Sequence, residues 1–182
     1  MLGLGPEDRE QRRPQLRRDD RPERLAVGRQ LRVLEVEREA VARAVSGEQT
    51  AKVAFEAIAN SGVLDDRTTA TMRVLLDHAT QHAELLAQTF QEELGKEPPL
   101  APNRAAIPGL ARVETQAGAL RLAMRIEEQA IAAHLGAVRR SHNAQLLKLI
   151  AGAVGSDGQS LVLLRELLHE EPVPRAFERG HG

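Results

Sequence analysis

Apolar residues recur at every third or fourth position along most of this chain, and the spacing predicts four long helices. We place these helices at about residues 31–60, 66–95, 109–140 and 143–169. An Asn-Ser-Gly stop ends the first helix, and Asp65 or Asp66 is placed to cap the second, which ends at Gly95. No stretch shows the sustained alternation of a β-strand. The expected fold is therefore all-α, an antiparallel four-helix bundle.

Three segments lie outside the predicted helices. Residues 1–30 contain eight Arg, six acidic residues and three prolines, a composition typical of a flexible charged arm. Residues 96–108, KEPPLAPNRAAIP, form a proline-rich connection that is long enough to run along the bundle if it is extended. Residues 170–182 are expected to form an extended tail. One bundle domain therefore spans residues 31–169.

Each apolar stripe is interrupted by polar side chains. They are, in chain order, Glu48, His78, His82, Glu127, Asp157 and Ser160. An ionised carboxylate on a buried stripe costs several kcal/mol unless it is paired or bound to a metal. Because every helix contributes at least one such residue, we interpret them as one polar layer inside the bundle.

The spacing of these residues indicates an internal repeat. Glu48 and His82 are 34 positions apart, and Glu127 and Ser160 are 33 positions apart. The two halves of the chain therefore look like two copies of one helix-turn-helix unit. Such a repeat places the polar residues of all four helices near one level of the bundle.

The chain resembles the ferritin-like superfamily, in particular its bacterial ferritin-like, desiccation-related and rubrerythrin-type branch. The resemblance rests on the repeat, on the LG-x-x-PP break at residues 94–99, and on a glutamate followed seven residues later by an aromatic position. In this chain that position is Phe55 after Glu48, and His134 after Glu127. The resemblance implies a four-helix bundle with a long connection between its second and third helices, and a homodimer.

The family resemblance also implies a di-iron site, which this chain retains only in part. The family takes one Glu from helices one and three, and a Glu-x-x-His pair from helices two and four. Glu48, Glu127 and His82 match this pattern, and Asp157 is a shortened carboxylate. At the remaining two positions the chain has Ala79 and Ser160. Neither Glu-x-x-His pair survives, so the predicted site is degenerate.

The ligand count favours fewer than two metal ions. Two divalent ions need about four carboxylates for charge balance, whereas the predicted site offers three carboxylates, with His78 or His134 as extra ligands. Our leading hypothesis is a non-catalytic structural or interaction module with a metal-free polar core and no cofactor. The alternative is a metalloprotein or oxidoreductase with one iron, zinc or manganese ion; di-iron chemistry is a third reading. A small-ligand cavity at the level of Ala79 and Ser160 is a further possibility.

Composition narrows the function classes further. The formal net charge of -1 and the absence of Trp and Tyr argue against a nucleic-acid partner. No Cys is present, which excludes disulfides and thiolate metal ligands. No apolar run reaches the ~20 residues of a membrane span, and no signal peptide is recognisable, so we expect a cytoplasmic protein away from membranes. Whether it is an enzyme, and which protein partner it has, stays open.

Two local motifs are similar to known functional motifs but lack residues that those functions require. HATQH, residues 78–82, lacks the Glu that a zinc-protease helix needs at position 79. GAVGSDG, residues 152–158, lacks the Lys and the preceding strand of a phosphate loop. We interpret its glycines as a site of tight helix packing.

Overall fold

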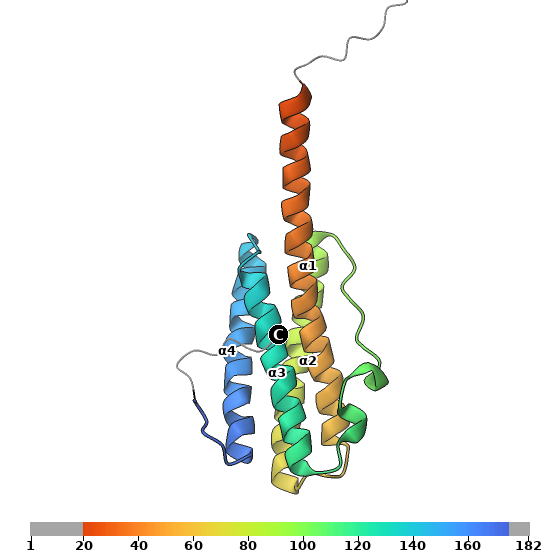
Figure 1. Cartoon of the computed structure of the whole chain (residues 1–182), viewed down its shortest axis with the longest axis vertical. Coiled ribbons are helices and arrows are strands. Elements are labelled where there is room, and N and C mark those ends of the chain that lie inside the picture. The colour runs from red at the N-terminus through yellow and green to blue at the C-terminus, as the bar shows by residue number, and fades with distance from the viewer. Residues whose placement is uncertain (1–19, 175–182) are drawn as a thin grey trace, which may run out of the picture. The chain divides into compact units, whose positions relative to one another are not determined.

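The protein is described here from a computed structural model that defines residues 20–174, with side chains from residue 25 onward. Four helices follow one another: α1 (Asp20–Ala59), α2 (Asp66–Leu94), α3 (Gln116–Val138) and α4 (Ala144–Leu167). Residues 20–174 contain no strand. The predicted all-α four-helix bundle is confirmed (Figure 1).

The first helix is longer than the sequence pattern predicts, since it begins at Asp20 rather than near residue 31. The chain divides after Val33 into two units, and the bundle belongs to the unit that begins at Leu34. In the first unit the described residues 20–33 are helical, and Leu25 and Leu31 are exposed there. The rest of the expected N-terminal arm, residues 1–19, and most of the expected tail, residues 175–182, lie outside the described residues.

Side-chain caps fix the starts of three helices. Asp65 accepts a hydrogen bond from the Thr68 amide at the start of α2, and Asn143 accepts one from Leu146 at the start of α4. Thr115 caps α3, so this helix begins at Gln116 and not near residue 109 as predicted. The residues before it form two short 3₁₀-helices, η1 (Arg104–Ala106) and η2 (Leu110–Arg112).

The predicted connection between α2 and α3 runs back along the bundle (Figure 1). It leaves α2 at Gly95, whose left-handed φ of 62° suits glycine. The Gln49 side chain donates a hydrogen bond to the Pro99 carbonyl at 2.6 Å, and Ile107 and Leu110 are buried. Because the connection spans the bundle, α2 and α3 point in the same direction, and α1 and α4 in the other.

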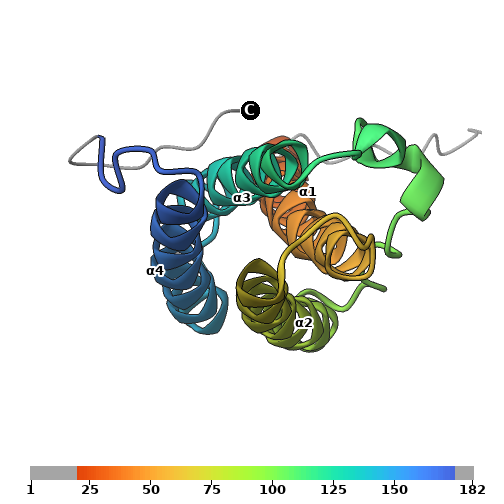
Figure 2. The same cartoon turned by 90° about the horizontal axis from the view of Figure 1, so that it is seen from below.

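Two apolar clusters fill the bundle, with a polar layer between them. One cluster contains Phe55, Leu75 and Leu120. The other contains Val45, Leu86 and Ile150. On every helix one residue of a polar layer lies between the segments that supply these two clusters: Glu48 on α1, His82 on α2, His134 on α3 and Asp157 on α4. Figure 2 shows the four helices around this common interior.

The fourth helix combines an apolar composition with a buried polar face. By length and composition alone, Ala144–Leu167 is apolar enough to span a membrane. However, it buries Asp157 and Arg165 as well as Leu161 within the bundle. We therefore assign it as a core helix, because core helices pass the same test of composition.

The glycines of α4 do not mark close packing, so that prediction was wrong. A Cβ added at Gly152, Gly155 or Gly158 would meet no heavy atom within 4 Å. The tight contact lies on α1 instead, where a Cβ at Gly47 would lie 3.3 Å from Ala130 Cα. Small residues therefore bring α1 and α3 together, whereas α4 has free space along its glycines.

Candidate metal centre

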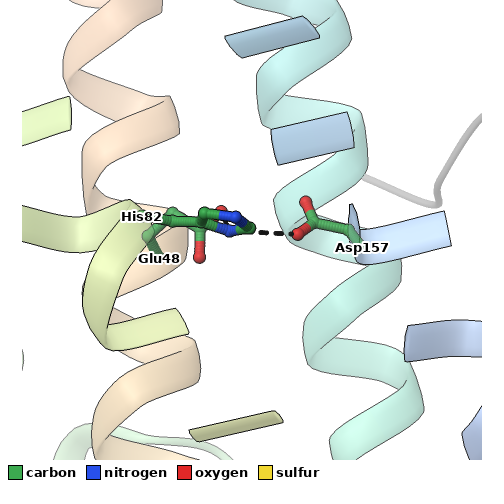
Figure 3. A group of neighbouring side chains, drawn as sticks. All are labelled: Glu48, His82 and Asp157. Carbon is green, nitrogen blue, oxygen red and sulfur yellow. Dashed lines mark ion pairs between the residues drawn. The ribbon is translucent and has the colours of Figure 1, made fainter. Parts of the chain in front are cut away.

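The polar layer brings together residues from all four helices. Glu48 lies on α1, His82 on α2, His134 on α3 and Asp157 on α4. Three of them are nearly inaccessible, whereas the His82 side chain is 17% exposed. Figure 3 shows Glu48, His82 and Asp157 pointing toward one another.

Carboxylates and imidazoles alternate in a closed ring, which we call the buried ring: Glu48, His82, Asp157 and His134. His82 Nδ1 lies 3.2 Å from Glu48 Oε1 and 3.5 Å from Asp157 Oδ1. His134 closes the other side, with Nε2 3.3 Å from Glu48 Oε1 and Nδ1 3.0 Å from Asp157 Oδ2. The last contact is a hydrogen bond. Two carboxylates thus share two imidazoles.

Three atoms of the ring lack an aligned hydrogen bond among the described residues. They are Glu48 Oε1, His82 Nδ1 and His134 Nε2. Buried polar atoms are almost always paired, and here the pairing consists of ion-pair contacts rather than aligned hydrogen bonds. Two ligand atoms that are each bonded at about 2.0–2.1 Å to a tetrahedrally coordinated metal ion lie roughly 3.3 Å apart. The ring distances of 3.0–3.5 Å fall around this value.

Burial and neighbouring charges shift the pKa values within the ring. Burial alone would lower the pKa of His82, but Asp157 and Glu48 outweigh it and raise this pKa to about 10. Burial likewise opposes ionisation of Asp157, yet contacts with the two histidines lower its pKa below 3.8. The pKa of Glu48 is raised above 4.5, chiefly by burial. In the absence of metal, a cationic His82 and an ionised Asp157 therefore balance each other at neutral pH.

Glu127 is buried in the same layer but differs from the ring carboxylates. Its pKa is raised well above 4.5, first by burial and then by the charges of Asp157 and Glu48. A hydrogen bond from Ser160 opposes the shift without cancelling it. Its surroundings therefore favour the protonated form of Glu127.

The structure brings together some of the expected ligands but not all of them. Ligand atoms of Glu48, His82 and Asp157 lie within 4.8 Å of one another, and we call these three residues the triad. His134 joins the triad in the buried ring. Glu127 is not part of the triad, and neither is His78, which is half-buried one turn before His82. Ala79 is packed into an apolar cluster.

The triad suits one divalent ion better than two. Glu48 and Asp157 together carry two negative charges, which balance one divalent cation when the histidines are neutral. Imidazole nitrogen and carboxylate oxygen are suitable ligands for zinc, manganese and iron. The Nδ1 atom of His134 hydrogen-bonds the Asp157 carboxylate and would orient it toward an ion.

Sequence reasoning missed two buried ionic groups outside the ring. Glu37 Oε1 accepts hydrogen bonds from the Ser141 hydroxyl at 2.7 Å and from the His142 amide at 2.8 Å. Glu37 lies 11 residues before Glu48, which is about three helical turns on the same face, and this spacing was the available signal. The Glu128 side chain is only 14% exposed, and its Oε1 lies 3.6 Å from Arg165 Nη2.

Comparisons with known proteins agree with this geometry. A family model described as a ferritin-like domain matches residues 33–170. The fold is similar to the crystal structure of a conserved hypothetical protein, rv2844, from Mycobacterium tuberculosis. The TM-score is 0.67 at 17% identity, over 79% of this chain and 97% of the other, and such a likeness shows the fold alone. No curated protein matches significantly in sequence. The family match covers most of the chain, so this protein belongs to the ferritin-like domain family.

Proposed function

We propose that this protein binds a single divalent metal ion through Glu48, His82 and Asp157. The observation that supports this function is the convergence of their ligand atoms, from three helices, within 4.8 Å. The unaligned Glu48 Oε1 and His82 Nδ1 atoms support it further, because a bound ion would satisfy both.

The chemistry open to such an ion follows from what surrounds it. A divalent ion bound there would act as a Lewis acid, or as a redox centre if it is iron or manganese. Glu48 and Asp157 would supply its neutralising charge, and His134 would hold the Asp157 carboxylate in place. The partial exposure of His82 leaves one side of the triad near solvent.

A metal-free structural module is the second candidate, and the raised pKa of His82 favours it. With a pKa of about 10, His82 carries a proton at neutral pH and pairs with both carboxylates without any metal. The ring would then act as a buried ion-pair network that fixes the register of the four helices. In the first candidate a metal ion neutralises Glu48 and Asp157, whereas in the second the protonated His82 does.

Metal binding to purified protein separates these candidates. The measurement is metal content after purification without chelator, followed by calorimetric titration with Zn²⁺ and Fe²⁺. We expect about one ion per chain, and we expect His82→Gln and Asp157→Asn to weaken binding by about 100-fold each. His78→Gln is the matched control on the same helix and should bind as the wild type does.

Two results would contradict the single-ion proposal. If no ion binds at micromolar concentrations, the buried ring is a metal-free network and the second candidate is correct. If two irons bind per chain, the charge balance derived from Glu48 and Asp157 is wrong and Glu127 must be ionised as a third carboxylate ligand.

A further inference from the structure

A groove between α2 and α4 connects the buried ring with solvent. Its volume is ≈ 500 Å³, and both His82 and Gly152 line it. Gly152 leaves open space on the α4 side of the groove, since an added Cβ would meet no heavy atom within 4 Å. Leu85 is 49% exposed and lines the same groove.

Within the buried ring, His82 is the residue that faces this groove. Its side chain is 17% exposed, whereas that of Glu48 is 1% exposed and that of His134 is 0% exposed. Neither of these two residues, nor Asp157, lines the groove. An ion that travels along the groove would therefore meet His82 first.

Two carboxylates, those of Glu92 and Glu93, line the groove together with Lys148 and His82. Carboxylates in a concave surface raise the local concentration of cations and speed their association. Two carboxylates thus line the path that a small cation would take to His82.

We propose that the divalent ion enters and leaves the triad through the α2–α4 groove. Glu92 and Glu93 attract the hydrated cation, and His82 is the first protein ligand that it meets. The ion then reaches Glu48 and Asp157 behind His82. This inference rests on the proposed metal binding, but it concerns the rates of exchange rather than the affinity.

The test uses Gly152→Leu to fill the groove and Co²⁺ absorption to follow the metal. Gly155→Leu is the matched control, because Gly155 is also exposed on α4 with nothing within 4 Å of an added Cβ, yet it does not line the groove. We expect Gly152→Leu to slow both loading and chelator-driven release by about tenfold, while the equilibrium Kd stays within about twofold. Gly155→Leu should leave both rates unchanged.

A second variant tests the charge of the groove without filling it. Replacing both acids, Glu92→Gln with Glu93→Gln, should lower the Co²⁺ loading rate several-fold at low salt and less at high salt. If Gly152→Leu and this double variant load as fast as wild type, the groove is not the route, although the metal site stands. If wild-type protein takes up no Co²⁺ at equilibrium, the proposed function fails and the route fails with it.

Discussion

At the scale of single residues, the surroundings of the Glu127 carboxyl group determine its pKa. Burial and the charges of Asp157 and Glu48 raise its pKa well above 4.5, which favours its uncharged form. We therefore predict that Glu127→Gln, a neutral side chain of the same shape, changes the free energy of unfolding by less than about 1 kcal/mol at pH 7. Metal affinity should stay within about threefold of wild type.

Denaturant unfolding and calorimetric metal titration check this prediction. Asp157→Asn is the comparison, since it removes an ionised member of the buried ring. A tenfold or greater loss of metal affinity in Glu127→Gln would show that Glu127 is an ionised ligand, as the family pattern implies.

At the scale of elements, Glu37 joins α1 to the turn between α3 and α4. Burial raises its pKa, but hydrogen bonds from Ser141, His142 and Asn143 outweigh burial and lower it below 4.5. A lowered folded-state pKa stabilises the protein above the unfolded pKa, and this contribution is lost as the pH falls through the folded pKa. We predict that Glu37→Gln lowers the free energy of unfolding by about 1–2 kcal/mol at pH 7.

The pH dependence separates this effect from lost packing. In chemical denaturation, the difference between wild type and Glu37→Gln should shrink below about pH 4. Glu39→Gln changes an exposed glutamate on the same helix and should have no measurable effect at either pH. A difference that is equal at pH 7 and pH 3 would contradict the charged hydrogen-bond role of Glu37.

Glycines on two helices have opposite roles. At Gly47 an added Cβ would lie 3.3 Å from the Cα of Ala130, whose helical backbone cannot move independently. We predict that Gly47→Ala destabilises the protein by about 1 kcal/mol through overpacking. Gly155→Ala should instead stabilise it by about 0.5–1 kcal/mol, because its Cβ meets open space in a helix.

Thermal unfolding of the two variants tests the contrast between these helices. The two shifts in Tm should have opposite signs. Stabilisation by Gly47→Ala would mean that α1 and α3 have room to separate at this position.

At the scale of the whole molecule, a bound ion would link all four helices, because the triad lies on α1, α2 and α4 and His134 bridges it from α3. A ligand that binds only the folded state, at a free concentration of 100 times its Kd, raises the free energy of unfolding by about 2.7 kcal/mol. For a chain of this size we predict a rise in Tm of roughly 5–10 °C. Calorimetric scans with and without Zn²⁺ measure it, and an equal rise in Asp157→Asn would place the binding elsewhere.

The oligomeric state also belongs to this scale, and the homodimer implied by the ferritin-like resemblance stays a prediction. Light scattering during size exclusion should give about twice the chain mass of 19.9 kDa. A mass equal to one chain across the micromolar range would contradict it.

The sequence by itself was sufficient for the fold, because helical periodicity, caps and the proline-rich break are local signals. Asp65 and Gly95 mark the ends of α2 as predicted. The start of α3 was missed because apolar spacing reports neither the side-chain cap at Thr115 nor the left-handed turn at Gly109. The level of the polar layer followed from the internal repeat that relates Glu48 and His82 to Glu127 and Ser160.

Tertiary structure decided which polar residues meet and with what charge. His134 enters the buried ring and His78 does not, although both lie within a turn or two of family positions. Successive side chains on a helix point about 100° apart, so the neighbour of a ligand points in a different direction. Sequence spacing alone does not fix how each helix is rotated about its own axis in the bundle. The charge states of Glu127 and His82 likewise depend on burial and on partners from other helices, and these exist only when the chain is folded.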